Sequence, residues 1–249
     1  MLKEKLNQKE VTIGSWITLG HASIAEIMAC AGYDWLVVDL EHTTISIEQA
    51  GELIRVIELC GVAPLVRLTS NHPDQIKRVM DAGAHGIVVP MVNSVHDASM
   101  AVAATRYSPR GIRGVGLARA QKFGVGFSDY LQWQKDGPVV IVQIEHKDAL
   151  EHLEEIFSVP GVDGFIIGPY DLSCSMGMPG EFDRAEFKEA MNKILATGLT
   201  MNFPAGIHIV EPDPERLGQV ISEGYRFIAY SVDIRMLDVA ARLGTTTVK

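Results

Sequence analysis

The chain has few cysteines, and their arrangement supports neither structural zinc nor a disulfide framework. Cys30, Cys60 and Cys174 form no CxxC motif, and no cysteine and histidine pairs have the spacing of a zinc finger. Small disulfide-rich secreted proteins carry a larger, closely spaced set of cysteines, which is missing here. We therefore interpret the three cysteines as packing residues.

Long apolar runs and an excess of positive charge are also missing. No stretch of about 18 apolar residues occurs, as a membrane span requires. The first ten residues, MLKEKLNQKE, are charged and do not resemble a signal peptide. The formal net charge is −9, and lysine and arginine are dispersed among acidic residues, so the basic surface of a nucleic-acid binder is absent. We expect a cytoplasmic protein without membrane or nucleic-acid partners.

Helical and strand patterns alternate along the whole chain. Helical segments that close with glycine are followed at once by apolar runs, as in RVMDAGAHGIVV. Strands are predicted at about residues 11–20, 34–42, 63–68, 86–92, 139–145, 162–169, 201–209 and 225–233. With helices between them, these strands predict an α/β fold: a single (β/α)₈ TIM barrel domain over residues 1–249. The alternative, a doubly wound open sheet, usually carries a glycine-rich phosphate turn, which TLGHASIAE after the first strand does not provide.

Residues 108–138 interrupt this alternation. The segment holds six glycines with cationic and aromatic residues, and it shows little periodicity. Such composition favours a long functional loop over a second domain, and we expect this loop to shape the mouth of the substrate pocket.

Polar residues of the kinds used in catalysis follow four of the apolar runs. VVDLEH ends on His42, APLVR on Arg67, VVIVQIE on Glu145 and GFIIGPYD on Asp171, while Asp81 precedes GIVVPMV. Parallel barrels place their chemistry at the C-terminal strand ends, so the pattern predicts an enzyme. Two carboxylates at neighbouring strand ends suit a hard divalent cation such as Mg²⁺ or Mn²⁺. The alternative for Asp171 is a helix N-cap.

His42 and Arg67 each allow a functional and a structural interpretation. His42 lies near Asp39 and Glu41, and a histidine with a carboxylate partner is a suitable general base near neutral pH. The alternative is a structural histidine. A guanidinium at a buried strand end needs an anionic partner, which is either a bound carboxylate or enolate, or an internal salt bridge.

Six segments in this order and spacing resemble one enzyme family. They are YDWLVVDLEH, LVRL, MDAGAHGIVVPMV, TRYSPRGIRGVG, VQIE and GVDGFIIGPYDLSCSMG. Together they resemble the HpcH/HpaI family of class II, metal-dependent 2-keto acid aldolases, from about Gly14 to Leu243. The resemblance implies a (β/α)₈ enzyme that cleaves a 4-hydroxy-2-keto acid to pyruvate and an aldehyde. Examples of such substrates are 4-hydroxy-2-oxoheptanedioate and the 2-keto-3-deoxy sugar acids.

The resemblance also assigns roles to particular residues. It implies that Glu145 and Asp171 hold a divalent cation, Mg²⁺, Mn²⁺ or Co²⁺, that pyruvate chelates. It implies that His42 is the base, that Asp81 raises the basicity of His42, and that Arg67 stabilises the enolate.

Further implied contacts concern the substrate and the assembly. The residues implied to contact the substrate are Trp16, Arg67, Gln143, Gly168, Pro169, Tyr170 and Asp171. Tyr170 departs from the family, where this position is usually small, and the segment GVGLARAQKFGVGFSD differs in length. The resemblance implies a homo-oligomer, a hexamer with exchanged C-terminal helices, and the apolar tail IRMLDVAARLG is compatible with exchange.

Two other functions stay open from the sequence. One is a lyase or condensing enzyme that acts on a CoA thioester, for which acyl-CoA turnover is the discriminating measurement and the 108–138 loop a possible binding element. The other is a non-catalytic 2-keto-acid sensor, which predicts an incomplete catalytic set. All five residues of that set are present: His42, Arg67, Asp81, Glu145 and Asp171.

Overall fold

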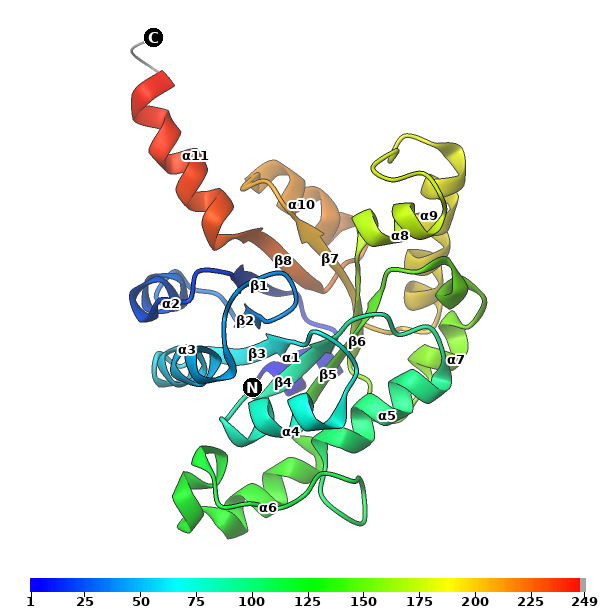
Figure 1. Ribbon diagram of the computed structural model, residues 1–249. Coiled ribbons are helices and arrows are strands. Elements are labelled where there is room, and N and C mark those ends of the chain that lie inside the picture. Colours follow the sequence, from blue (N-terminus) through cyan, green and yellow to red (C-terminus); the bar gives the residue numbers. More distant parts are fainter. Residues whose placement is uncertain (247–249) are drawn as a thin grey trace.

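The computed structural model describes residues 1–246, which form a closed barrel of eight parallel strands in sequence order (Figure 1). The strands are β1 (Thr12–Ile17), β2 (Trp35–Asp39), β3 (Ala63–Arg67), β4 (Gly86–Val89), β5 (Val139–Ile144), β6 (Gly164–Ile167), β7 (Ala205–Ile209) and β8 (Phe227–Val232). Pairing of β8 with β1 closes the barrel. The predicted (β/α)₈ architecture is confirmed, and every strand lies within its predicted range. The strands begin at most two residues later and end at most three residues earlier than predicted, except that β7 begins four residues later.

Helices surround the barrel and follow the expected alternation. Those that pack around its outside are α2 (Ala22–Ala29), α3 (Ile47–Leu59), α4 (Pro73–Asp81), α5 (Val95–Thr105), α7 (Leu153–Phe157), α9 (Ala185–Thr200) and α10 (Pro214–Glu223). The others are α1 (Leu2–Asn7), η1 (Arg119–Gly124), α6 (Phe127–Asp136), η2 (Lys147–Glu151), α8 (Pro169–Ser175) and α11 (Asp233–Thr246). Helix α3 shows why they begin where they do: the Ser46 hydroxyl accepts from the Gln49 N–H, and the Gln49 side chain accepts from the Ser46 N–H.

Alternating side chains divide the apolar core into two layers. One set of strand residues packs against the helices, and the other fills the barrel interior, where Trp35 stacks on Phe227 with ring centroids 4.0 Å apart. A Cβ on Gly14 would lie 2.0 Å from the Trp35 ring, so only glycine fits there. The interior of the barrel is therefore filled near its N-terminal end, and space for a ligand remains toward the C-terminal ends of the strands.

The short helix α1 closes the N-terminal end of the barrel. Leu2 and Leu6 are buried against the interior cluster that contains Trp35 and Phe227. The Lys3 ammonium lies 2.5 Å from the Asp163 carboxylate and also donates to the Pro138 carbonyl. The sequence did not predict this helix, because only two apolar residues mark it.

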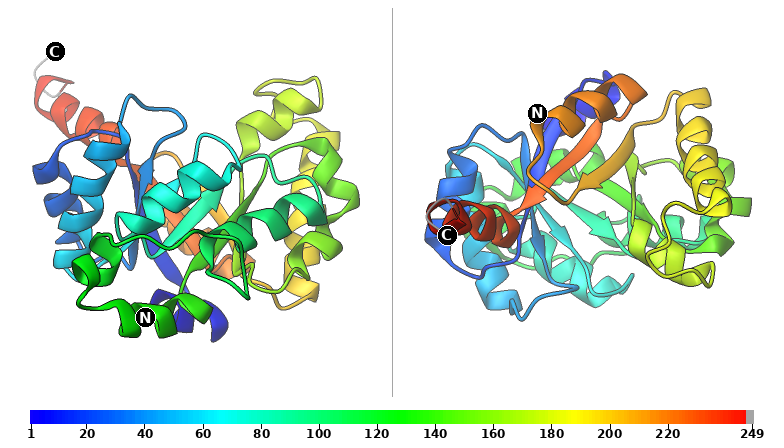
Figure 2. Two further views of the ribbon diagram at one scale, coloured as in Figure 1. Left: turned by 60° about the horizontal axis from the view of Figure 1, so that its bottom comes forward. Right: turned by 90° about the horizontal axis from the view of Figure 1, so that it is seen from above.

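The segment 108–138 corrects an expectation. It follows helix α5 and leads into β5, so it lies at the N-terminal face, where Figure 2 shows α6 beside the N-terminal helix. Arg119 donates to the Ala82 carbonyl and to Glu58, and Arg113 pairs with Asp81 at 2.5 Å, which fastens the segment to the ends of α3 and α4. It does not shape the mouth of the pocket, which opens at the opposite face.

Helix α11 extends away from the body of the barrel (Figure 1). Its start is anchored because the Asp233 carboxylate accepts from the backbone N–H of Thr18 and of Leu19, each at 2.8 Å. Beyond this point Ile234, Leu237 and Leu243 are exposed. Among the described residues, no helix combines the length and the apolar character needed to cross a bilayer.

Candidate active site

A pocket of about 210 Å³ lies at the C-terminal ends of the strands. Its lining residues are Trp16, His42, Arg67, Gln143, Ile166, Ile167, Gly168, Pro169, Tyr170, Asp171 and His208. Eight of these were singled out from the sequence. Side chains two residues apart on a strand point to the same face of the sheet. The face that fills the barrel interior near the N-terminal ends of the strands therefore also faces the pocket near their C-terminal ends.

Arg67 is held by an internal salt bridge and still faces the pocket. Strand register places it opposite Asp39, and the guanidinium donates to both Asp39 carboxylate oxygens at 2.8 Å. Glu41 lies 3.4 Å away, and the Trp16 ring lies 4.4 Å below the guanidinium carbon. Burial opposes the charge, but the hydrogen bond to Asp39 keeps the pKa of Arg67 above its ordinary value. The guanidinium is thus fixed in position and permanently charged.

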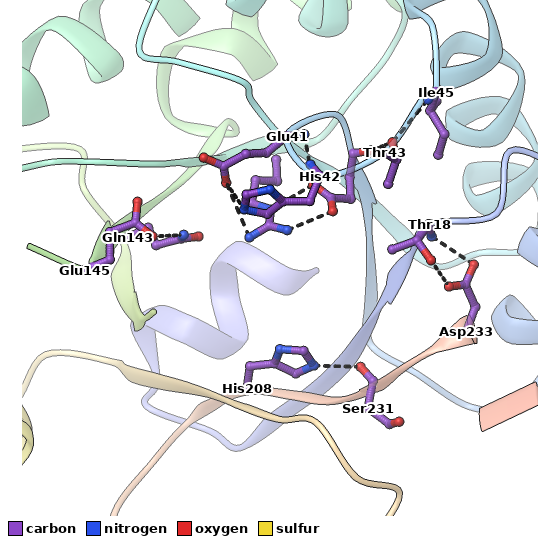
Figure 3. A network of polar contacts seen from close by, with 12 residues as sticks. Thr18, Glu41, His42, Thr43, Ile45, Gln143, Glu145, His208, Ser231 and Asp233 are labelled. Carbon is purple, nitrogen blue, oxygen red and sulfur yellow. Dashed lines mark hydrogen bonds and ion pairs between the residues drawn. The ribbon is translucent and has the colours of Figure 1, made fainter. Parts of the chain in front are cut away.

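His42 lies beyond the end of its strand and at the rim of the pocket. Strand β2 ends at Asp39, and the Thr43 hydroxyl donates to the Asp39 carbonyl at 2.5 Å to begin the turn that carries His42. The imidazole is 63% exposed, and its Nε2 lies 3.8 Å from the Glu41 carboxylate (Figure 3). The carboxylate partner of His42 in this chain is therefore Glu41.

Glu145 is a buried carboxylate whose orientation is fixed from two sides. One oxygen accepts from the Met91 backbone N–H at 2.7 Å, and the other accepts from the Gln143 amide (Figure 3). Met91 adopts a positive φ of 54°, an uncommon conformation that aims this N–H at the site. Burial, helped by the nearby charges of Glu41 and Asp171 and opposed by the two hydrogen bonds, raises the pKa of Glu145 to about 7.

Asp171 is not a helix N-cap. Helix α8 begins with Gly168 at the N-cap position and no side-chain cap, while Asp171 lies within the first turn with an exposed side chain. Gly168 brings this turn close to Glu145, because a Cβ at Gly168 would lie 2.7 Å from a Glu145 carboxylate oxygen. Gly168 thus lets the turn that carries Asp171 lie against Glu145, with which Asp171 interacts electrostatically.

The carboxylates suit a cation. Burial raises the pKa of Glu41 to about 7, with Asp39 and Asp171 adding to this and Arg67 opposing it. One Glu41 oxygen is buried with no hydrogen-bond partner among residues 1–246. The described part of the chain contains no group of three or more His, Cys, Asp or Glu side chains in ligand geometry. The residues therefore fit a divalent ion held by two carboxylates, with water and substrate oxygens as its other ligands.

Asp81 does not join the other predicted residues within this chain. It ends helix α4, whose C-terminus lies at the N-terminal face of the barrel, and it pairs with Arg113. The expected contact between Asp81 and His42 is therefore not made here. The sequence motif around Asp81 gave no indication of this, because it shows neither the direction of the helix nor the arginine from the 108–138 segment.

His208 lines the pocket but was not predicted to belong to it. It lies on β7 two residues after Gly206, which packs among the strands beside Phe227. Since side chains two apart share a face, His208 also points into the barrel. This parity was available from the sequence segment AGIHI once β7 had been placed.

Comparison with known proteins gives matches over almost the whole chain. A family model described as HpcH/HpaI aldolase/citrate lyase matches residues 12–239. The hydroxypyruvate/pyruvate aldolase of Sagittula stellata is 38% identical over 240 residues, which are 96% of this chain and 94% of that protein. The 2-keto-3-deoxy-L-rhamnonate aldolase of Escherichia coli K12 is 36% identical over 233 residues, 93% of this chain and 86% of that protein. A solved HpcH/HpaI aldolase/citrate lyase family protein from Burkholderia cenocepacia has a TM-score of 0.93 and 36% identity, covering 99% of this chain and 98% of that one.

Proposed function

Since the chain belongs to the HpcH/HpaI aldolase/citrate lyase family, it is an aldolase-type lyase, and we propose that it reversibly cleaves a 4-hydroxy-2-keto acid to pyruvate and an aldehyde. The observation that carries this proposal is that Arg67 and Asp171 line one pocket and that the buried Glu145 lies close enough to interact electrostatically with both. Two carboxylates for a cation and a fixed positive charge are the groups that stabilise an enolate. The relatives named hydroxypyruvate/pyruvate aldolase and 2-keto-3-deoxy-L-rhamnonate aldolase support the substrate class.

Glu145 and Asp171 would hold a divalent cation, Mg²⁺, Mn²⁺ or Co²⁺, which when bound supplies Lewis-acid stabilisation of negative charge on the 2-keto oxygen. Gln143 and the Met91 N–H keep the Glu145 carboxylate in place for this task. Gly168 allows the close approach of α8 that the pair requires.

The proton and charge transfers follow from the remaining residues. In cleavage, the His42 imidazole takes the proton of the C4 hydroxyl, and Glu41 at 3.8 Å stabilises the imidazolium. The C4–O electrons form the aldehyde carbonyl, and the C3–C4 bond pair passes into the enolate of pyruvate. Arg67, positioned by Asp39, donates hydrogen bonds to the enolate oxygen. Protonation of C3 then gives pyruvate.

The outer wall of the pocket is aromatic. Tyr170 is 58% exposed, and its ring packs edge-on against Phe182 with centroids 4.9 Å apart. This position lies at the mouth, so we assign Tyr170 to the aldehyde half of the substrate. The alternative of a CoA thioester substrate loses its support, because the 108–138 segment is fastened to the opposite face.

We further propose that the enzyme is a homo-oligomer, a hexamer in which C-terminal helices are exchanged. Exposed apolar side chains on α11, among them Ile234 and Leu237, support this, as does the way the helix leaves the barrel (Figure 1). A partner subunit would cover this apolar surface.

Exchange of the pyruvate methyl protons with solvent, followed by NMR, tests the proposed function. We expect exchange that requires Mg²⁺ or Mn²⁺, stops on chelation and falls by about 10²-fold or more in His42→Ala. Exchange that continued both without metal and in His42→Ala would contradict the proposed mechanism. A panel of aldehydes offered with pyruvate then identifies the acceptor.

A further inference from the structure

His208 presents an unprotonated ring nitrogen to the pocket. Its Nε2 lies 3.2 Å from the Ser231 carbonyl oxygen (Figure 3), and a carbonyl only accepts, so Nε2 carries the proton. Burial, with a smaller effect of the Arg67 charge and against the hydrogen bond to Ser231, lowers the pKa of His208 to about 4, so the ring is neutral near pH 7. In a neutral imidazole the other nitrogen, Nδ1, is then a hydrogen-bond acceptor, and it has no partner among the described side chains and backbone groups.

The backbone is distorted at the residue that orients this ring. Ser231 is a buried residue with a positive φ of 54°, and the pairing of β1 with β8 shifts register at this point, between Gly14 and Trp16. The Ser231 carbonyl also accepts from the Ser15 hydroxyl at 3.1 Å, and the Ser231 hydroxyl donates to the Val210 carbonyl at 2.9 Å. An irregularity that re-aims a backbone group beside a pocket is typical of a functional position.

The position of His208 within the pocket indicates which half of the substrate it meets. His42 and Tyr170 are largely exposed at the mouth, whereas His208 lies deeper, with its ring centroid 5.6 Å from that of Trp16. This step rests on the proposed function. A 2-keto acid whose keto and carboxylate oxygens face Glu145, Asp171 and Arg67 turns its third carbon toward the part of the pocket where Trp16 and His208 lie.

If that carbon is a methyl group, as in pyruvate, the acceptor stays unpaired. A ligand that covers an acceptor without supplying a donor binds more weakly, so such a site discriminates in favour of ligands that pair with the acceptor. We infer that the 2-keto acid this enzyme uses best carries a hydroxyl on C3, which donates a hydrogen bond to Nδ1 of His208. The aldol that it cleaves is then a 3,4-dihydroxy-2-keto acid, and His208 is a specificity-determining residue.

Binding to the wild-type enzyme tests this inference without any variant. Calorimetric titration in the presence of Mg²⁺ compares hydroxypyruvate with 3-fluoropyruvate, which has a similar size and electron withdrawal but lacks the O–H donor. We expect hydroxypyruvate to bind about tenfold more tightly than 3-fluoropyruvate, and pyruvate to bind no better than 3-fluoropyruvate. Equal binding of hydroxypyruvate and 3-fluoropyruvate would overturn the inference.

Variants then assign the selectivity to the ring nitrogen. His208→Leu removes the acceptor with little change in bulk, and His208→Asn keeps an acceptor near the position of Nδ1. The ratio of hydroxypyruvate to pyruvate kcat/KM, with one aldehyde, should fall about tenfold in His208→Leu and less in His208→Asn. His152→Leu is the control and should keep the wild-type ratio, because His152 is partly exposed at the start of α7 and does not line the pocket.

The outcomes separate this inference from the proposed function. If no 2-keto acid reacts but hydroxypyruvate binds selectively, the aldolase proposal fails and the assignment of His208 stands. If both acids react and His208→Leu keeps the wild-type ratio, the assignment of His208 fails and the aldolase proposal stands. If His208→Leu does not fold, the wild-type binding comparison decides.

Discussion

At the scale of single residues, the central feature is a buried carboxylate that carries an elevated pKa in the absence of a cation. Burial disfavours the charged form of Glu145, and Glu41 and Asp171 add repulsion. A divalent ion reverses this balance because it favours the charged form. The carboxylates of the site therefore need a neutralising positive charge, which bound protons supply at low pH.

This balance predicts a pH-dependent effect of metal on stability. The pKa of Glu145 is about 7 when folded against an ordinary 4.5, so its neutral form favours folding below pH 4.5, and this contribution is lost as the pH rises to about 7. Metal binding should therefore raise the melting temperature more at about pH 8 than at about pH 5.5. Thermal scans with and without Mn²⁺ check this. Glu145→Gln should remove most of the metal effect at both pH values, and a metal effect that shrank with rising pH would contradict the assignment.

The glycine beside Glu145 gives a second prediction. In Gly168→Ala the new methyl group would lie 2.7 Å from a Glu145 oxygen and 2.9 Å from its Cβ, so the carboxylate must move. We expect weaker metal binding and a loss of activity on the order of 10²-fold, measured by Mn²⁺ titration and steady-state kinetics. Gly218→Ala is the matched control, because its Cβ meets nothing within 4 Å and it lies on the outer helix α10. If Gly168→Ala kept full metal affinity, the close approach would not be needed for the site.

At the scale of elements, the 108–138 segment is attached to the barrel through ion pairs as well as through the packing of Tyr130 and Trp133. Glu58 at the end of α3 contacts both His85 and Arg119. The hydrogen bond from His85 holds the pKa of Glu58 down at about 2, and Arg119 adds to this against the effect of burial. The strength of this attachment therefore depends on the protonation state of Glu58.

We expect the attachment to weaken in acid. The pKa of Glu58 is lower in the folded than in the unfolded chain, so its stabilising contribution is present above about pH 4.5 and is lost as the pH falls toward 2. Limited proteolysis within residues 108–138 should accelerate between about pH 6 and about pH 3.5, and Glu58→Gln should be cleaved rapidly at both. Glu52→Gln, on the same helix but in an exposed pair with Arg55, should behave like wild type. Equal proteolysis of the two variants at about pH 6 would rule out the attachment.

The sequence predicted most of the elements because parallel strands buried on both faces are continuous apolar runs, which helices with regular polar faces separate. It placed the 108–138 segment at the wrong face, because glycine-rich composition indicates irregular structure without saying where it lies. Position in the chain held that information: a segment between a helix and the next strand belongs to the N-terminal face. Likewise, His208 follows from strand parity, whereas the pairing of Asp81 with Arg113 depends on tertiary packing that no local pattern records.

At the scale of the whole molecule, α1 completes a core that the strands alone leave open. Leu6 is 1% exposed at the N-terminal end of the barrel. Leu6→Ala should lower the free energy of unfolding by about 2 to 5 kcal/mol, measured by urea denaturation. Leu59→Ala, at a position 78% exposed, should change it by less than about 0.5 kcal/mol. A similar effect of both substitutions would show that α1 does not contribute to the core.

The assembly gives a further prediction at this scale. If α11 packs on a partner subunit, Leu237→Glu should shift the protein to smaller species, because a charge would enter an apolar interface. Light scattering coupled to size-exclusion chromatography measures this. Glu215→Gln on α10 serves as a surface control. An unchanged mass for Leu237→Glu would argue against the exchange of C-terminal helices.

The closed N-terminal end of the barrel also bears on the order of events in turnover. With Leu2, Leu6 and the stacked rings of Trp35 and Phe227 filling that end, substrates enter and leave through the mouth at which His42 and Tyr170 lie. The 2-keto acid occupies the deeper part, so an aldehyde already seated at the mouth would obstruct it. The kinetics should therefore be ordered: in condensation the 2-keto acid binds before the aldehyde, and in cleavage the aldehyde departs first.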